Sequence, residues 1–106
     1  METALKALAE PNRRRILTLV RDEELTAGEI ASHFEVSRPA VSQHLTVLKE
    51  AGLVHERRNG TRRLYSVRPE GLADVKAFFE GFWDEKLQAL KREAEREERK
   101  KRGKHD

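Results

Sequence analysis

Apolar residues in the first half of the chain recur at helical spacing in two short stretches separated by a polar turn. In the first stretch, Ile30 and Phe34 lie on one side of a predicted helix. Thr26 and Glu29 have the spacing of a capping box, in which each side chain accepts a backbone N–H at the start of the helix. We therefore predict a short helix that begins after Thr26 and a turn at residues 35–36.

The second stretch predicts a longer helix with one apolar and one polar face. Ser37 is a good N-cap, and Gly52 supplies the left-handed residue that ends the helix. The apolar face consists of Val41, Leu45 and Leu48. With this face buried, the outward side chains suit hydrogen bonding to base edges in the major groove of DNA. These candidate DNA-contacting residues are Ser37, Arg38, Ser42, Gln43 and Thr46. If this helix is considered alone, an ordinary solvent-exposed face remains an alternative interpretation.

The dipeptide Asn59-Gly60 predicts a hairpin with a two-residue type I′ turn. The opposite pairs expected from this turn are Arg58–Thr61, Glu56–Arg63 and Val54–Tyr65. Four arginines lie near the tip: Arg57, Arg58, Arg62 and Arg63. So much positive charge is typical of contact with DNA phosphates or with a narrow minor groove. The alternative is an edge hairpin that its charges protect from aggregation.

The order of helix, turn, helix and basic hairpin is the plan of a winged helix-turn-helix, which places its second helix in the major groove. The expected fold class is therefore mainly α with a two-stranded β-wing. Residues 37–68 carry seven Lys/Arg and two Asp/Glu, a net charge of +5 in a chain of net charge +3. This concentration of positive charge favours double-stranded DNA as the partner. The alternative is a winged helix that serves as a protein–protein adaptor, which would need no arginines at its wing tip.

Two further segments are predicted to be helices that pair the chain with a second copy of itself. Residues 3–9 carry Leu5 and Leu8 on one side. A long helix is expected over residues 69–98. Its broad apolar face includes Phe78, Phe79, Phe82 and Trp83. One small domain cannot cover this face, and large aromatic patches usually mark interfaces, so we predict a homodimer.

The composition of the chain limits the number of domains and the kinds of site that it can contain. With 106 residues, 37% hydrophobic and 39% charged, the chain is one small domain, which we place at residues 1–98. Residues 99–106 are mostly charged, and we expect a disordered tail there. No cysteine is present, which excludes disulfides and thiolate metal sites. The three arginines at residues 13–15 are expected to be solvated or paired within the chain rather than bound to DNA.

The sequence contains no apolar run as long as a membrane span or the core of a signal peptide. We therefore expect a cytoplasmic protein without a membrane partner. It also lacks a phosphate-binding glycine loop and a recognisable pair of nucleophile and base. We expect no enzymatic activity and no cofactor.

The sequence resembles the ArsR family of winged-helix repressors over roughly residues 3–90. The motifs that carry the resemblance are LAEPNRRRILTLV, SRPAVSQHLTVLKEAGLV and RRNGTRRLYSV. The segment FWDEKLQAL is similar to the SdpR-like branch, which lacks metal ligands. The resemblance implies a homodimer, built through the first and last helices, that represses transcription at an inverted-repeat operator. By position it also implies DNA contacts from the second helix of the motif and from the four wing arginines.

Two departures from the family pattern concern metals. The resemblance implies cysteines in the first helix of the motif in metal-sensing members, whereas residues 24–29 here contain none. Other members carry pairs of aspartate and histidine along the last helix, and residues 69–98 contain no histidine. His33, His44 and His55 are scattered without i,i+4 spacing. We expect no metal site and name no inducer; the alternative is a metal or small-ligand sensor whose site the sequence does not reveal.

Overall fold

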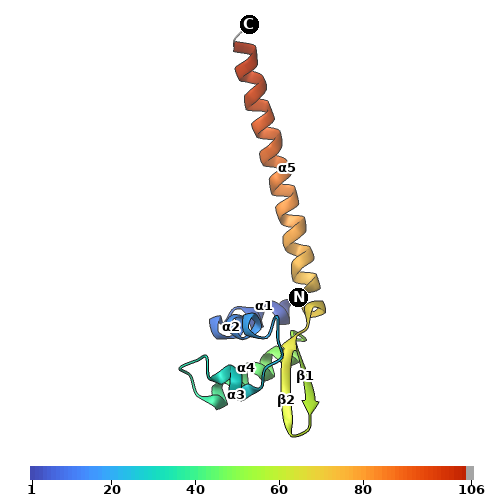
Figure 1. Cartoon of the computed structure of the whole chain (residues 1–106). Coiled ribbons are helices and arrows are strands. Elements are labelled where there is room, and N and C mark those ends of the chain that lie inside the picture. Colours follow the sequence, from blue (N-terminus) through green and yellow to red (C-terminus); the bar gives the residue numbers. More distant parts are fainter. Residues whose placement is uncertain (105–106) are drawn as a thin grey trace. The chain divides into compact units, whose positions relative to one another are not determined.

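The computed structural model describes residues 1–104, with side chains described for residues 1–101 (Figure 1). Its elements are α1 (Glu2–Leu8), α2 (Pro11–Leu19), α3 (Ala27–Ala31), α4 (Arg38–Glu50), β1 (Val54–Asn59), β2 (Arg62–Val67), the 3₁₀ helix η1 (Pro69–Leu72) and α5 (Ala73–Lys104). The chain divides into two compact units, residues 1–75 and the part from residue 76 onward. The helices and the single antiparallel pair of strands confirm the predicted fold class.

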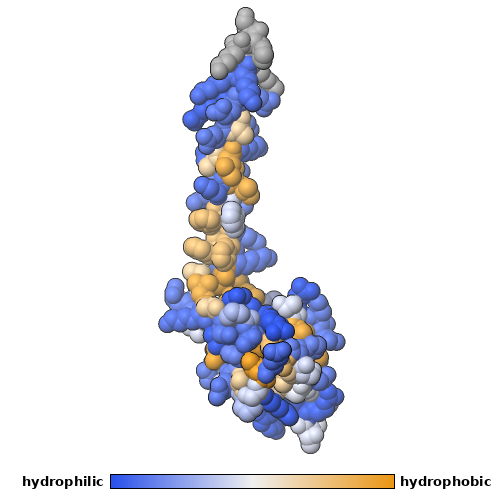
Figure 2. Space-filling model, turned by 90° about the vertical axis from the view of Figure 1, so that its left-hand side faces the viewer, coloured by the Kyte–Doolittle hydropathy of each residue, from blue (hydrophilic) through white to orange (hydrophobic). Residues whose placement is uncertain are grey.

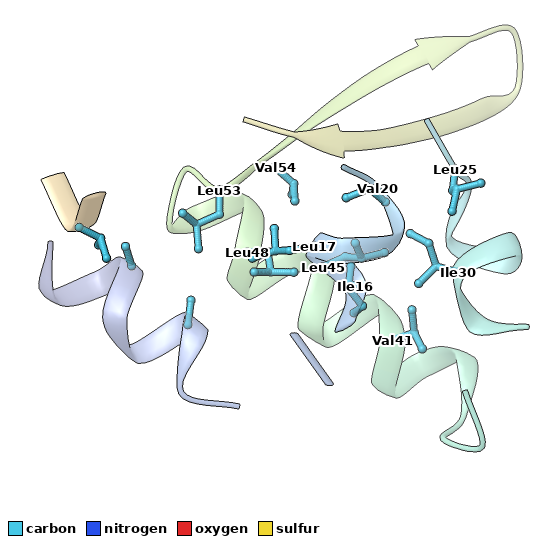
Figure 3. Packing of buried hydrophobic residues seen from close by; sticks show 13 residues of the cluster. Ile16, Leu17, Val20, Leu25, Ile30, Val41, Leu45, Leu48, Leu53 and Val54 are labelled. Carbon is cyan, nitrogen blue, oxygen red and sulfur yellow. The ribbon is translucent and has the colours of Figure 1, made fainter. Parts of the chain in front are cut away.

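The core of the first unit lies where α2, α3 and α4 meet the beginning of the hairpin (Figure 3). The apolar face predicted for the second helix of the motif is confirmed, because Val41, Leu45 and Leu48 are 0%, 2% and 0% exposed. Ile16 of α2 and Ile30 of α3 are fully buried in the same cluster. Burial of one such side chain contributes about 1.5–3 kcal/mol to stability. These contacts therefore fix which face of α4 remains exposed.

Local signals set both ends of α4, as predicted. The Ser37 hydroxyl accepts a hydrogen bond from the Ala40 N–H at 3.3 Å. At the other end, Gly52 has a φ of +74°. The Leu53 N–H donates to the Leu48 carbonyl at 2.9 Å, which completes a Schellman motif. The motif needs a left-handed residue, and glycine adopts that conformation without strain.

α3 begins as predicted but ends earlier. The capping box is confirmed: the Glu29 N–H donates to Thr26 Oγ1, and the Thr26 N–H donates to Glu29 Oε1, both at 3.1 Å. The Ser32 hydroxyl donates to the Glu29 carbonyl at 2.6 Å. This side chain competes with the backbone for that carbonyl and favours the end of the helix. The turn therefore begins at Ser32 instead of at residues 35–36, and Phe34 packs against the core from outside the helix.

The predicted hairpin forms, but the predicted register is wrong. The observed pairs are Val54–Val67, His55–Ser66, Glu56–Tyr65, Arg57–Leu64, Arg58–Arg63 and Asn59–Arg62. The two-residue loop is therefore Gly60 and Thr61. Gly60 has a φ of +66°, and in the described part of the chain only glycines have a positive φ. A turn with glycine at its first central position is of type II′, which avoids the positive φ that a type I′ turn would require of Asn59.

Contacts outside the hairpin fix this register. Leu25 and Tyr65 form an isolated antiparallel bridge, with N–H to carbonyl distances of 3.1 and 2.8 Å. The Val67 N–H also donates to the Val20 carbonyl at 3.2 Å. These bonds tie β2 to segments far earlier in the chain. The turn residues alone therefore could not reveal the register.

The arginines at the start of α2 bond within the chain, as predicted. Arg13 Nε donates to the Ala7 carbonyl, and Arg14 Nη1 donates to the Leu8 carbonyl, each at 2.7 Å. Arg15 also donates to a backbone carbonyl, at 3.1 Å. The first two bonds satisfy carbonyls at the C-terminal end of α1, where positive charge is favourable. They hold α1 and α2 together.

α5 begins later and ends later than predicted. The 3₁₀ helix η1 occupies residues 69–72, so the α-helix starts at Ala73. It continues to Lys104, past the predicted end at residue 98, because glutamate, arginine and lysine are good helix formers and no proline interrupts them. Residues 99–104 are thus drawn as helix, residues 105–106 lie outside the described part, and the disordered tail at residues 99–106 stays a prediction.

Candidate nucleic-acid interface

The exposed face of α4 carries side chains that can bond to base edges. Ser42, Gln43 and Thr46 are all exposed, as predicted. Thr46 Oγ1 donates to the Ser42 carbonyl at 3.0 Å, so its hydroxyl hydrogen is already engaged. The Gln43 side chain makes no hydrogen bond within the described residues, and its amide offers donors and an acceptor. Gln43 is therefore fully available to a partner outside the chain.

The first turn of α4 brings Ser37 and Arg38 to the same face. The Ser37 oxygen accepts the capping hydrogen bond, so its O–H remains free to donate. Arg38 is exposed, and its guanidinium lies beside Gly28 of α3. A Cβ atom added to Gly28 would lie 3.7 Å from Arg38 Cζ. The Arg38 guanidinium therefore lies within ordinary contact distance of the start of α3.

Two of the four wing arginines bond to carboxylates near the start of α3. Arg57 binds Glu24 through Nε and Nη2, each at 2.9 Å from a different carboxylate oxygen. Arg62 donates only through Nη2, at 3.0 Å from Glu29 Oε1. Each pair joins residues 33 positions apart in the sequence. Neither carboxylate could be recognised from the sequence as a wing partner, because no local pattern signals a contact that depends on how the hairpin docks.

Glu56 binds positive charge on the other face of the hairpin. Lys49 Nζ of α4 lies 2.7 Å from Glu56 Oε2, and Arg63 Nε lies 3.5 Å from Glu56 Oε1. The ion pair predicted between Glu56 and Arg63 therefore forms, although Arg63 lies directly opposite Arg58 in the ladder. The hydrogen bond from Lys49 is the main reason that the pKa of Glu56 is lowered. Arg58 makes no ion pair within the described residues.

The carboxylates near α3 also have lowered pKa values. For Glu24, the hydrogen bond from Arg57 is the largest cause of the lowered pKa. For Glu29, the hydrogen bonds from the Thr26 backbone and side chain are the largest causes, and attraction to Arg62 lowers the pKa further. Both carboxylates are therefore ionised at neutral pH, and each offsets the charge of one wing arginine.

A cleft of about 550 Å³ separates the start of α3 and the start of α4 from the wing tip. Its walls include Gly28, Arg38, Ser42, Thr61, Arg62 and Arg63. A second cleft, of about 340 Å³, lies between α4 and the hairpin and includes Glu56 and Tyr65. The first cleft has three guanidinium groups among its lining residues. A concave surface of this charge favours an anion.

α5 carries an apolar face whose large side chains are exposed. Figure 2 shows apolar side chains gathered along one side of this helix. Its residues Phe78, Phe79, Phe82 and Trp83 are between 48% and 56% exposed. On α1, Leu5 is 38% exposed and Leu8 is half-buried. Among the described residues, no helix is long and apolar enough to cross a membrane.

Residues 24–29 do not supply a metal site of the kind that cysteines would form. Leu25 is buried, while Thr26 and Glu29 are engaged in the capping box. In the part of the chain that the structure describes, no group of three or more histidine, aspartate or glutamate side chains could hold a metal ion. His44 Nε2 lies 3.8 Å from Glu10 Oε2, so this histidine has a carboxylate neighbour.

Known proteins are similar to this chain in sequence and in fold. The family model described as bacterial regulatory protein, arsR family, matches residues 10–56. The HTH-type transcriptional regulator Rv2034 of Mycobacterium tuberculosis is 46% identical over 81% of this chain and 80% of its own length. The transcriptional repressor SdpR of Bacillus subtilis is 40% identical over 70% of this chain and 82% of its own length.

Among solved structures, the homodimeric winged helix-turn-helix DNA-binding domain Mb0332 from Mycobacterium bovis is similar, with a TM-score of 0.63. The two are 34% identical, and the match covers 79% of this chain and 78% of that one. These relatives are transcription regulators and not enzymes, in agreement with the exposed polar face of α4 and the basic wing. The chain belongs to the arsR family of bacterial regulatory proteins and is a winged helix-turn-helix DNA-binding transcription regulator.

Proposed function

We propose that this regulator is a homodimeric repressor that binds an inverted-repeat operator and does not respond to metals. The observation that carries the proposal is the exposed polar face of α4 next to a cleft lined by arginines. SdpR, with 40% identity, is a transcriptional repressor, and Mb0332 is homodimeric. Both properties are proposed for this chain on the strength of that likeness together with its own exposed faces.

In this proposal α4 reads bases. A glutamine amide can form two hydrogen bonds with adenine, and an arginine guanidinium can do the same with guanine. Gln43 is unbonded within the described residues and suits the first role, whereas Arg38 on the flank suits the second or a phosphate. Ser37, Ser42 and Thr46 are short enough to let the backbone of α4 approach the groove closely.

The wing binds the DNA backbone or a narrow minor groove. Its contacts come from Arg57, Arg58, Arg62 and Arg63. Arg58 is the most available of the four, because it has no ion pair within the described residues. Arg57, Arg62 and Arg63 each form an ion pair with a carboxylate of the protein. A phosphate must compete with that carboxylate, which reduces the net contribution of the arginine to DNA binding.

Dimerisation through α1 and α5 covers the exposed apolar side chains. The contributing residues are Leu5, Leu8, Phe78, Phe79, Phe82 and Trp83. Burial of several aromatic side chains supplies the energy of a stable interface. Two-fold symmetry then presents two copies of α4 to one side of the DNA. The half-sites of the operator must be inverted and centred about one helical turn apart, or a multiple of it.

Independence from metals is supported by the chemistry of the chain. Cysteine is absent from the sequence, and the segment at residues 24–29 carries a structural capping box where thiolates would be needed. A footprint of the purified protein on the DNA upstream of its own gene tests the proposed function. We expect two protected half-sites related by a two-fold axis and reduced transcription in vitro. Protection of one isolated half-site, or increased transcription, would contradict the proposal.

A further inference from the structure

The cleft between α3, α4 and the wing tip brings together side chains from three separate elements. Arg38 comes from the recognition helix, Arg62 and Arg63 come from β2, and Gly28 comes from α3. The Arg38 guanidinium lies beside Gly28 of α3, so that a Cβ atom added there would be 3.7 Å from Arg38 Cζ. Glu29 does not line the cleft, but its Oε1 accepts a hydrogen bond at 3.0 Å from Nη2 of Arg62, which does. The cleft therefore has a wall that attracts anions, and a carboxylate outside the cleft binds one of its arginines.

We propose that this cleft binds one phosphodiester group of the DNA backbone through Arg38 and Arg62, and that Glu29 weakens this contact by competing for Arg62. The inference rests on the proposed DNA-binding function. It adds the location of a phosphate contact and a residue that sets its strength. Glu29 is thus a residue that tunes affinity without touching DNA.

Arg62 is only partly engaged by the protein. It uses one nitrogen, Nη2, for Glu29, and its other N–H groups are unbonded within the described residues. A guanidinium has five N–H donors, so Arg62 can reach a phosphate from its present position. Arg57 differs, because it uses Nε and Nη2 for Glu24 and does not line the cleft.

Glu29 cannot easily move away from the cleft. The same oxygen, Oε1, accepts the Thr26 N–H at 3.1 Å and Arg62 Nη2 at 3.0 Å. Rotation of the carboxylate away from Arg62 would break the capping box. A phosphate that enters the cleft therefore meets a negative charge that stays in place, and it must share Arg62 with that charge.

The substitution Glu29→Gln tests this competition. Glutamine also serves in capping boxes, so the variant keeps the start of α3 while it removes the charge. We expect binding to become about fivefold tighter per subunit on operator and scrambled duplexes alike, because an exposed charge pair has an effect of this order. Fluorescence anisotropy over a salt series measures the change.

Glu23→Gln is the matched control. It makes the same change in net charge at an exposed carboxylate that holds no arginine within the described residues and lies outside this cleft. We expect its affinity to stay within about twofold of the wild type, since a distant exposed charge is screened by salt. Equal gains for the two variants would show a general charge effect and would overturn the inference.

A double-mutant cycle separates competition from simple repulsion. If Glu29 competes for Arg62, then Arg62→Ala must cost more affinity in the E29Q protein than in the wild type. An equal cost in both backgrounds would overturn the role of Glu29. The reverse order, with a smaller cost in the E29Q protein, would show that Glu29 positions Arg62 and would also contradict the proposal.

A titration with inorganic phosphate tests anion binding at the cleft independently of DNA binding. In the wild-type protein, NMR signals of the Arg38 and Arg62 Nε–H groups should shift at lower phosphate concentration than the signal of Arg57. If the wild type bound no duplex, the proposed function would fail, while these shifts would still support the anion site. If the duplex bound but neither arginine responded to phosphate, the inference would fail and the proposed function would stand.

Discussion

Among the exposed side chains of α4, Gln43 has the most specific chemistry to offer, because its amide is unbonded within the described residues. We expect Gln43→Ala to cost about 1–3 kcal/mol at the operator and to relax the preference at one base position in each half-site. Affinities for operator and scrambled duplexes measure both effects. Gln88→Ala, which removes the same side chain from α5, should leave both affinities unchanged. An equal loss on both duplexes would contradict a base-reading role for Gln43.

Gly71 matters for stability rather than for binding. A Cβ atom at this position would overlap the Gly52 carbonyl oxygen, so the missing side chain of Gly71 allows the backbone after the wing to pass close to the end of α4. We expect Gly71→Ala to destabilise the protein by about 1–3 kcal/mol, because the backbone would have to shift. Urea denaturation measures the loss.

Gly28→Ala is the control for Gly71→Ala. Its added Cβ would make only ordinary contact with Arg38, the nearest atom lying at 3.7 Å. Alanine also favours the helix more than glycine does, so we expect a gain of up to about 1 kcal/mol. If both substitutions had the same effect, the close approach at Gly71 would not limit stability.

At the scale of elements, three carboxylates join the wing to the helices or to the segment before α3: Glu24, Glu29 and Glu56. Each has a pKa below its ordinary value of 4.5 in the folded protein. Their contribution to stability is therefore fully present above that ordinary value, and it is lost as the pH falls through the lowered pKa values of the folded state. We therefore expect the melting temperature to decrease as the solution is acidified below about pH 4.5.

Thermal melts of the wild type and of the E24Q/E29Q/E56Q protein test this assignment. The difference between the two melting temperatures should be largest near neutral pH and should shrink as the solution is acidified. A difference that stayed constant between about pH 7 and about pH 3 would show that the stabilisation comes from packing of these side chains and not from their charge.

Local signals predicted most elements of the DNA-binding unit. The capping box of Thr26 and Glu29, the N-cap at Ser37 and the turn at Gly52 each act within a few residues, so the sequence reveals them directly. The register of the hairpin could not be predicted in the same way. It depends on Leu25, which lies far from Tyr65 in the sequence and joins it only in the folded structure.

The same division applies to the candidate site. The exposed positions of α4 were predictable, because the apolar spacing of Val41, Leu45 and Leu48 fixes the opposite face. The partners of the wing arginines were not, because Glu24 and Glu29 meet them across 33 residues. The sequence therefore indicates which side chains are exposed, whereas only the structure shows how much of their charge is already paired.

For the whole molecule, the exposed aromatic face of α5 predicts the oligomeric state. Sedimentation equilibrium at micromolar concentration should give twice the chain mass of 12.3 kDa. The double substitution F82E/W83E should produce monomers and abolish tight operator binding, because charges at this face cannot be buried against a partner. Gln88→Glu adds charge to the same helix and should leave the dimer intact. A stable wild-type monomer would contradict the proposed assembly.

Metals should not control the binding of the protein to its operator. Stoichiometric zinc, nickel, copper or arsenite should leave operator affinity unchanged, because the chain has no cysteine and its histidines are scattered. Anisotropy titrations with and without each metal measure this directly, and a chelator gives the baseline. Release of DNA by one equivalent of any metal would contradict the proposal and would point to carboxylate and histidine ligands.

The bridge between Leu25 and Tyr65 has a consequence for how this regulator can diversify. Its two hydrogen bonds close a loop that contains α3, the turn, α4 and most of the wing, so the segment that we propose reads DNA enters and leaves the fold at neighbouring points. A segment with adjacent ends can be exchanged without moving the rest of the chain when its core residues, here Val41, Leu45 and Leu48 among others, are kept. Operator preference could therefore be transplanted between relatives as a cassette of residues 25–65, with the pairing helices kept unchanged.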